Sequence, residues 1–225
     1  MLNPPIYSLV MSLVVAGSVA ILDAPVRADD CIVIENFATA KVGAFPAEWK
    51  VRNDSGKQAY TVAEEAGSRF LRARSAGLGQ QAARSFEWNL DEYPILAWRW
   101  RPMEFPKEGD ERRSSSNDSV LAVYLLVPYS SIRGPRAVKY VWSERVPTGT
   151  HLESNMGLTQ VRVLRSGAAG KDTWNEERVD VRADYLSAFE LTSAPRPAGI
   201  AVLTDSDDTA SSAAGDYADF RACRK

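Results

Sequence analysis

The chain has 225 residues, of which 45% are hydrophobic and 25% charged, and its 27 basic and 29 acidic side chains give a formal net charge of −2. This near balance argues against a nucleic-acid-binding protein, because such proteins usually concentrate a basic excess on one face. Subtracting the first 28 residues leaves 197, which is enough for one domain with a sizeable core and too few for two comfortable ones.

The N-terminal segment carries an apolar stretch from Ile6 to Leu22, then a polar break, then Val-Arg-Ala at 26–28. This pattern is typical of a cleaved secretory signal, so we expect residues 1–28 to be a signal peptide and residues 29–225 to form one exported domain, periplasmic or secreted. A retained N-terminal anchor is the alternative, because no Lys or Arg precedes the apolar stretch. Past this segment no apolar run reaches the length of a membrane span.

The two cysteines, Cys31 and Cys223, stand at opposite ends of the expected exported domain. Because thiols are readily joined in an oxidising compartment, we expect a disulfide between them. In the chain-entropy model, closing so long a loop stabilises the fold by about 4 to 5 kcal/mol. The bridge would require the first and last strands to lie side by side, and two separate thiols are the alternative.

Alternating apolar and polar residues, rich in Val, Ile, Tyr and Trp, recur along the chain between Gly, Pro, Asn, Asp and Ser. This pattern predicts an all-β, antiparallel β-sandwich. Only the segment from Arg182 to Thr192 has apolar residues at helical spacing, which predicts one short helix near 182–190. Charged, Ser-rich or Gly-rich residues at 103–118 and 167–172 predict exposed loops. The predicted strands lie near residues 31–37, 58–63, 69–74, 95–101, 119–127, 137–144, 159–166, 176–182 and 199–204.

Several kinds of catalytic site find little support in the sequence. The single histidine, His151, lies in a predicted turn, whereas a Ser-His-Asp or Cys-His hydrolase needs a poised base and a zinc site needs several His or Cys ligands. No phosphate-binding loop, dinucleotide fingerprint or nucleophile elbow occurs. Glu176 and Asp180 share one strand face, but they lie about 10 Å or more apart with Arg178 between them. This arrangement favours a ladder of alternating charges over a pair of glycosidase carboxylates.

Aromatic and basic residues alternate in two predicted strands. Trp98 and Trp100 share the face opposite Arg99 and Arg101, and a similar aromatic pair recurs in the strand at 137–144. One interpretation places the aromatic face in the core and the Arg face in solvent; the other makes a sheet with Arg, Tyr and Trp a groove for sugars. The candidate ligand-binding residues are Arg99, Arg101, Tyr140, Trp142, Asp118 and Asp205.

The stretch TDSDDTASSAAGD at 204–216 raises the question of a cation site. Asp205, Asp207 and Asp216 occupy the first, third and last places of a calcium-loop register. Ala210 stands where that loop needs Gly, and a predicted strand precedes it where an EF-hand has a helix. Asp and Ser are also ordinary turn formers. A simple turn, a cation site that includes Asp205 and Asp207, and a direct ligand contact all remain open.

Stretches such as EERVDVRADYLSAF at 176–189 and TDSDDT at 204–209 resemble the bacterial family known as domain of unknown function 3047. The resemblance runs from about Glu35 to Phe220. It implies a jelly-roll sandwich related in outline to galactose-binding-like and carbohydrate-binding modules, and it implies no catalytic residues. Such modules often hold a structural cation where the first and last strands meet, so the resemblance points to Glu35 and Asp219 as further candidate metal ligands, with Ca²⁺ as the candidate cofactor.

We therefore expect an exported, non-enzymatic module that binds carbohydrate or envelope glycan, without a nucleic-acid partner. The first alternative is an envelope scaffold that binds another protein. The second is an enzyme acting on polysaccharide through carboxylates, with Asp118, Glu177 and Asp205 as the acids, which would need a carboxyl of raised pKa inside a cleft.

Overall fold

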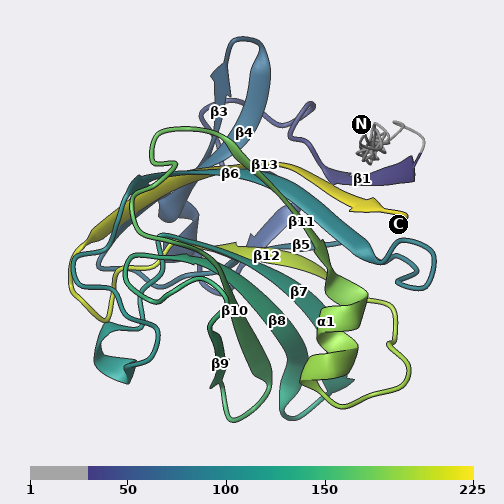
Figure 1. Ribbon diagram of the computed structural model, residues 1–225. Coiled ribbons are helices and arrows are strands. Elements are labelled where there is room, and N and C mark those ends of the chain that lie inside the picture. The colour runs from purple at the N-terminus through teal and green to yellow at the C-terminus, as the bar shows by residue number, and fades with distance from the viewer. Residues whose placement is uncertain (1–29) are drawn as a thin grey trace, which may run out of the picture.

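The computed structural model describes residues 30–225, so the predicted signal sequence lies outside the described residues. Two β-sheets lie face to face (Figure 1). Sheet A contains β1 (Cys31–Glu35), β3 (Tyr60–Glu65), β4 (Ser68–Ala76), β6 (Ile95–Glu104), β11 (Asn175–Asp180) and β13 (Ser212–Cys223). Sheet B contains β2 (Trp49–Val51), β5 (Ala82–Ser85), β7 (Leu121–Ser130), β8 (Gly134–Ser143), β9 (His151–Ser154), β10 (Thr159–Ser166) and β12 (Gly199–Leu203). The helices are α1 (Val181–Ala188) and two short 3₁₀ helices, Asp54–Ala59 and Ser114–Ser116.

The expected all-β sandwich of the jelly-roll type, with one short helix, is confirmed. The strand order is β11-β6-β13-β4-β3 in sheet A, with β1 paired to β13, and β2-β5-β12-β7-β8-β10-β9 in sheet B. All described pairs are antiparallel except β8 with β10, which run parallel. Helix α1 begins after Asp180, whose Oδ1 accepts a hydrogen bond from the Ala183 N–H at 2.8 Å, as an N-cap does. Among residues 30–225, no helix has the length and apolar character needed to cross a membrane.

Aromatic rings from both sheets fill the space between them. The Trp98 ring lies 5.3 Å from that of Trp100 and 5.7 Å from that of Tyr140, and Trp100 lies 5.7 Å from Trp142, measured between centroids. All four side chains have no exposed surface. Tyr140 and Trp142 are thus core residues that a ligand cannot reach, and their assignment as candidate ligand-binding residues is corrected. Alternation along β6 and β8 turned these rings inward.

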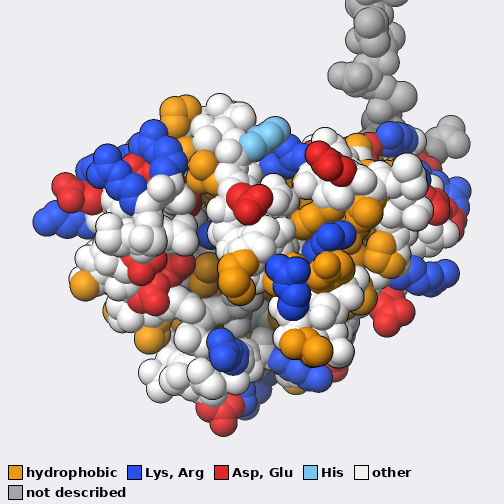
Figure 2. Space-filling model, turned by 90° about the horizontal axis from the view of Figure 1, so that it is seen from below, with side chains coloured by type: hydrophobic (Ala, Val, Ile, Leu, Met, Phe, Trp, Pro, Cys, Tyr) orange, Lys and Arg blue, Asp and Glu red, His pale blue; other side chains and the backbone are white. Residues whose placement is uncertain are grey.

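The outer face of sheet B carries a second apolar cluster, on the side away from sheet A. Lys139 and Tyr124 lie on this face as Cα partners in β8 and β7, and both are buried. Figure 2 views the molecule from the side of sheet B and shows basic and acidic side chains interspersed among apolar ones, without a continuous basic surface. The members of this cluster are Ala122, Tyr124, Ala137, Val141, Val146, Val161, Val163, Ala201 and Leu203.

The loop predicted at 103–118 is less exposed than its composition suggests. β6 continues to Glu104, and the remaining residues fold back so that Asp110 and Asp118 are 5% and 0% exposed. The prediction of an exposed loop is therefore wrong for these two residues. Their carboxylates can be buried because hydrogen bonds within the loop and to other segments replace those with water. The second predicted loop, 167–172, is half-buried to exposed, as expected.

The predicted disulfide is confirmed. Cys31 and Cys223 are Cα partners in the β1–β13 ladder, and their sulfurs lie 2.07 Å apart. The first and last strands therefore lie side by side, as the bridge requires. No free cysteine occurs in residues 30–225.

Replacing both cysteines, as in Cys31→Ala with Cys223→Ala, should lower the free energy of unfolding by about 2 to 5 kcal/mol, because the unfolded chain regains the freedom of its ends. Urea titration followed by circular dichroism measures this loss. A reductant should destabilise the native protein similarly and leave the double variant unchanged. Equal stability of the double variant and the oxidised protein would contradict the stabilising role.

Candidate functional site

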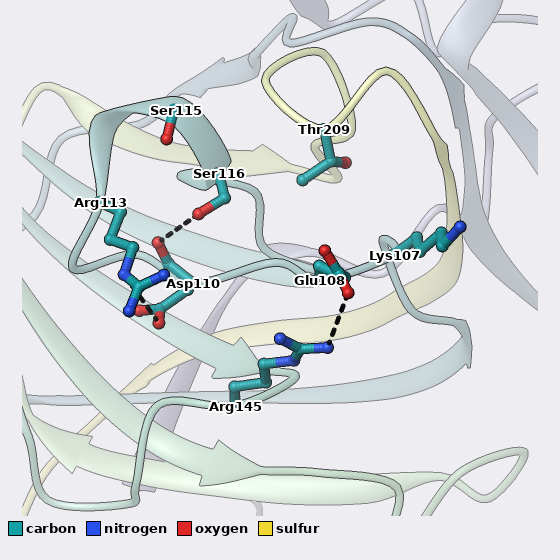
Figure 3. A pocket seen from close by; sticks show the side chains of 8 residues that line it. All are labelled: Lys107, Glu108, Asp110, Arg113, Ser115, Ser116, Arg145 and Thr209. Atoms are coloured by element: carbon teal, nitrogen blue, oxygen red, sulfur yellow. Dashed lines mark hydrogen bonds and ion pairs between the residues drawn. The ribbon is translucent and has the colours of Figure 1, made fainter.

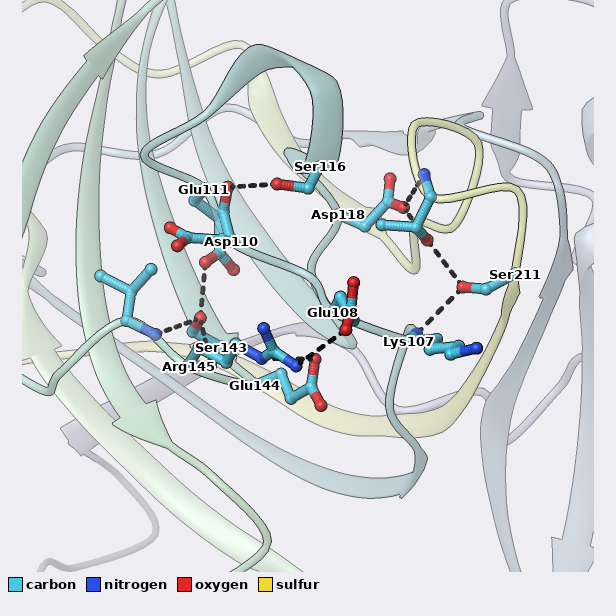
Figure 4. Close-up of polar contacts among 12 residues, drawn as sticks. Lys107, Glu108, Asp110, Glu111, Ser116, Asp118, Ser143, Glu144, Arg145 and Ser211 are labelled. Atoms are coloured by element: carbon cyan, nitrogen blue, oxygen red, sulfur yellow. Dashed lines mark hydrogen bonds and ion pairs between the residues drawn. The ribbon is translucent and has the colours of Figure 1, made fainter.

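The β6–β7 loop (residues 105–120) and the β12–β13 turn (residues 204–211) are joined through Asp118. Its Oδ1 accepts a hydrogen bond from the Asp208 N–H at 3.2 Å, and its Oδ2 accepts from the Thr209 N–H at 2.8 Å and the Thr209 hydroxyl at 2.5 Å. The Ser211 hydroxyl continues this network to the Lys107 N–H, at 3.1 Å (Figure 4). Asp118 thereby fixes the two segments to each other.

Strand alternation explains how the β12–β13 turn divides its side chains. Thr204 and Ser206 point between the sheets, where Thr204 Oγ1 lies 2.9 Å from the Tyr217 hydroxyl and Ser206 Oγ lies 2.7 Å from Ser75 Oγ. Asp205, between them, must face the other way, toward the outer side of sheet B. Its backbone N–H donates to the Ser119 carbonyl at 3.0 Å, which holds the turn against the β6–β7 loop.

Asp118, Asp205 and Asp207 form a carboxylate cluster, with one oxygen from each within 4.8 Å of the others. Asp118 and Asp205 are buried and Asp207 is exposed. Asp205 Oδ1 is buried without a hydrogen-bond partner among the described residues. A Cβ at Gly79 would lie only 2.6 Å from Asp207 Oδ1 and 2.8 Å from Asp205 Oδ1. A residue with a side chain at position 79 would therefore clash with these oxygens.

The electrostatics of the cluster are unbalanced. Burial, followed by the neighbouring Asp207 carboxyl, raises the pKa of Asp205 to about 8, although the Lys139 ammonium opposes the change. Burial alone would lower the pKa of Lys139, but Tyr124 and the carboxylates of Asp205 and Glu111 outweigh it and raise that pKa. Lys139 is therefore a buried cation at neutral pH, and it interacts electrostatically with the carboxylates of both Asp205 and Glu111.

Glu111 extends the polar network to β8. Its Oε1 accepts from the Ser119 hydroxyl at 2.9 Å and its Oε2 from the Ser143 hydroxyl at 2.5 Å. The Ser143 oxygen in turn accepts from the Val146 N–H at 3.0 Å (Figure 4). The β6–β7 loop is thus tied both to the turn after β12 and to the end of β8.

A polar pocket of about 390 Å³ opens beside Thr209 (Figure 3). Arg145 lies 3.7 Å from Glu108 and from Glu144, and Arg113 lies 3.9 Å from Asp110, measured between nitrogen and oxygen. These separations are too long for hydrogen bonds, so the guanidinium donors remain available to a ligand. The residues that line the polar pocket are Lys107, Glu108, Asp110, Arg113, Ser115, Ser116, Arg145 and Thr209.

Asp110 is held at the pocket wall by its neighbour Arg112. The Asp110 carboxylate accepts from Arg112 Nε at 2.7 Å, from Nη2 at 2.6 Å and from the backbone N–H at 3.1 Å. The hydrogen bonds from Arg112 lower the pKa of Asp110 to about 2. The pocket therefore presents an ionised carboxylate at any pH above about 4.

Arg99 and Arg101 lie on the outer face of sheet A, apart from the carboxylate cluster. Arg99 Nε donates to Asp219 at 2.6 Å, and Arg101 Nη2 donates to the buried Asp216 at 2.6 Å. Arg101 also stacks on Trp174, with 4.7 Å from its Cζ to the ring centroid. Asp216 is therefore an ion-pair partner, and the calcium-loop register from Asp205 to Asp216 is not formed. Arg99 and Asp219 line a separate polar hollow of about 330 Å³.

The two metal candidates at the chain ends, Glu35 and Asp219, accept hydrogen bonds from different protein donors. Glu35 Oε1 accepts from the Phe37 N–H at 2.7 Å and Oε2 from the Trp49 indole N–H at 3.0 Å, whereas Asp219 pairs with Arg99. Each carboxylate thus has its own protein donors, and neither belongs to the carboxylate cluster. Within residues 30–225, the carboxylate cluster is the only group of three acidic, His or Cys side chains close enough to share an ion.

Glu177 also lies outside the carboxylate cluster. It stands on β11 in sheet A, where its Oε1 accepts from the Trp100 indole N–H at 3.0 Å and from Arg165 Nε. The three acids considered for an enzyme are therefore not assembled: Asp118 and Asp205 are together, and Glu177 is held elsewhere by its own donors.

Sequence reasoning missed Glu111, Lys139, Gly79 and the basic residues of the polar pocket. For Lys139 a signal exists, since its neighbours on the same strand face, Ala137 and Val141, are apolar and a lone charge on such a face needs a buried partner. For Glu111 and Gly79 the signal is absent, because their roles depend on segments distant in sequence.

Comparisons with known proteins give one family and several distant structures. The family model described as "Protein of unknown function (DUF3047)" matches residues 47–221. A comparison with curated proteins finds no match.

The solved structures to which the chain is similar include three polysaccharide-degrading enzymes or their modules. A meso-active, thermo-stable cellulase derived from Cel12A of Rhodothermus marinus is 11% identical, with 77% of this chain and 95% of that chain covered and a TM-score of 0.40. The family 11 xylanase from Neocallimastix patriciarum is 13% identical, with 76% and 89% covered and a TM-score of 0.39. The CBM22-1 and GH10 modules of xylanase 10B from Clostridium thermocellum, complexed with xylohexaose, are 13% identical, with 87% and 28% covered and a TM-score of 0.37. At these scores the likeness says nothing about the chemistry of the site.

The Asp110→Asn variant should unfold more easily than the native protein at about pH 6, with a difference that shrinks as the pH falls. Because the folded pKa of about 2 lies below the usual 3.8, the ionised carboxylate stabilises the folded state above pH 4, and this contribution is lost between about pH 4 and pH 2. Urea unfolding across this pH range measures the difference.

Glu87→Gln is the matched control, since Glu87 is exposed and has no ion pair among the described residues. It should show no pH-dependent difference from the native protein. A difference for Asp110→Asn that stays constant from pH 6 to pH 3 would contradict the role of its charge.

Proposed function

The chain belongs to the DUF3047 family of proteins of unknown function, and we propose that this member is an exported, non-enzymatic module that binds carbohydrate in the polar pocket. The observation that carries the proposal is the lining of the pocket, in which every side chain is charged or bears a hydroxyl. Its volume of about 390 Å³ lies within the range of small-molecule sites. The described residues form one β-sandwich, consistent with a single module.

The chemistry of the lining suits an acidic sugar unit. Three cations, Lys107, Arg113 and Arg145, face two carboxylates in the pocket wall. Arginine binds carboxylates through two parallel hydrogen bonds, and carboxylates and hydroxyls of the wall accept from or donate to sugar hydroxyls. The excess of cations favours a uronate-type sugar over a neutral one.

The burial of the acids supports binding rather than hydrolysis. A glycosidase needs two carboxyl groups that both face the scissile bond. Asp118 is fully buried and both of its oxygens accept protein hydrogen bonds, while Asp205 is 7% exposed. His151 is an exposed residue of the edge strand β9, beside Arg162. None of these groups lines the polar pocket. Of the two carboxylates that do, Asp110 is engaged by Arg112 and has a pKa of about 2, so it does not carry the proton that a general acid needs at neutral pH.

The proposed location is the periplasm or the medium outside the cell. The Cys31–Cys223 disulfide supports it, because disulfides persist mainly in oxidising compartments. The N-terminal sequence pattern, an apolar stretch followed by small residues, is typical of a signal peptide and supports the same location.

A protein-binding scaffold is the second candidate, favoured by the tip of the β7–β8 hairpin. Ile132 is 95% exposed there and Tyr129 is 46% exposed. Met156, 83% exposed, lies next to this tip, since its carbonyl accepts from Arg133 Nη2 at 3.3 Å. Exposed apolar side chains that gather in one place are typical of protein contacts.

Acidic polysaccharides such as polygalacturonate and alginate should bind the native protein saturably in affinity electrophoresis and calorimetry, and neutral xylan and cellulose should bind more weakly. Arg145→Ala should weaken binding by about tenfold or more, because a charge-assisted contact is worth about 1.5 to 3 kcal/mol. Arg196→Ala is the control, since Arg196 is exposed and outside the pocket.

Equal losses from Arg145→Ala and Arg196→Ala would show that binding is unspecific attraction to basic residues and would contradict the pocket as the site. No binding to any polysaccharide by folded protein would count against the carbohydrate proposal as a whole. Release of new reducing ends during incubation with a bound polysaccharide would overturn the non-enzymatic part.

A further inference from the structure

The carboxylate cluster does not line the polar pocket. The two are connected by Thr209, which lines the pocket and whose hydroxyl donates to Asp118. The three carboxylates come from two segments about 90 residues apart, the β6–β7 loop and the β12–β13 turn. Like charges brought within 4.8 Å repel each other, so the folded state needs a compensating group at this place.

Asp118 is compensated by the protein itself. Its two oxygens accept three hydrogen bonds from Asp208 and Thr209. Asp205 is different: only 7% of the residue is exposed, and its Oδ1 has no hydrogen-bond partner among the described residues. A buried oxygen of a carboxylate that faces two other carboxylates lacks a positive partner on that side.

The one buried cation nearby does not balance the charge. Lys139 is 5% exposed and interacts with both Asp205 and Glu111. Two buried carboxyl groups of the cluster, Asp118 and Asp205, thus stand beside one buried ammonium group among the described residues. A bound cation would supply the further positive charge that this place lacks.

We propose that Asp118, Asp205 and Asp207 bind a divalent cation, and that this ion is Ca²⁺. All three ligands offer carboxylate oxygens, the donor type that hard cations prefer, and no His or Cys takes part. Exposed Asp207 leaves the cluster open to solvent, so water completes the coordination shell. Gly79 belongs to the site because any side chain there would displace the Asp205 and Asp207 oxygens.

The ion would join the β6–β7 loop to the β12–β13 turn, which the Asp118 hydrogen bonds already hold together. Its role is thus to stabilise the segments behind the polar pocket. This inference goes beyond the proposed function and does not depend on it, since a cation site would exist whether or not the pocket binds sugar.

The test uses the purified protein, stripped with a chelator and then titrated with CaCl₂ alone, followed by calorimetry and thermal unfolding. We expect saturable binding of one ion per chain. At a Ca²⁺ concentration of 100 times Kd, the folding equilibrium constant should rise about 100-fold. Asp205→Asn and Asp207→Asn should each weaken Ca²⁺ binding by about tenfold or more.

Asp208→Asn is the matched control, because Asp208 is an adjacent exposed acid whose carboxylate is outside the cluster and whose backbone N–H still donates to Asp118. It should bind Ca²⁺ as the native protein does. Asp205→Asn keeps the shape of the side chain and removes repulsion, so it should fold without metal, which keeps a loss of binding interpretable.

Two outcomes would overturn the inference. The first is a native protein whose unfolding and heat of mixing do not change on addition of CaCl₂. If the Asp205→Asn variant is then more stable than the native protein, Asp205 and Asp207 share a proton in place of an ion. The second outcome is equal loss of Ca²⁺ binding in Asp205→Asn and Asp208→Asn.

Discussion

The fold depends on the cluster of aromatic rings that fills the space between its two sheets. Trp98 and Trp100 of β6 and Tyr140 and Trp142 of β8 occupy the interior with no exposed surface, and their rings touch across the gap between the sheets. Large rings in a close-packed interior leave few alternative registers, since a shift of one residue would turn all of them to the opposite face. The polar side chains between them must then lie on the outer faces, where the ion pairs of Arg99 and Arg101 and the buried Lys139 are found.

The candidate site is formed where regular strands end. The β6–β7 loop and the β12–β13 turn carry many polar groups, and Asp118 satisfies three of their donors at once. The same contacts bring Asp118 next to Asp205 and Asp207. The hydrogen bonds that join the two segments therefore also bring negative charges together. Thr209 belongs to both features, since it donates to Asp118 and lines the polar pocket.

The sandwich, its helix and the disulfide could be predicted from the sequence because they depend on local alternation and on two residues with one plausible partner each. Short strands such as β2 and β9 escaped detection since three or four residues carry too little pattern. Asp205 and Asp207 were recognised as acids that could bind a cation, but Asp118 joins them from the β6–β7 loop, and Glu35 and Asp219 proved to face different partners. Composition also suggested an exposed loop at 103–118, because sequence alone does not reveal that a carboxylate has found buried donors.

The bond between Cys31 and Cys223 has a consequence for resistance to proteolysis. Since it links residues 192 positions apart, the polypeptide between them forms a covalent macrocycle that includes both sheets. A protease that nicks an accessible connection, such as the one at 167–172, leaves two pieces still held by sulfur and by the strand ladders on either side of the cut. Such a nicked molecule keeps its shape, and a piece can separate only after a second cut or reduction of the disulfide.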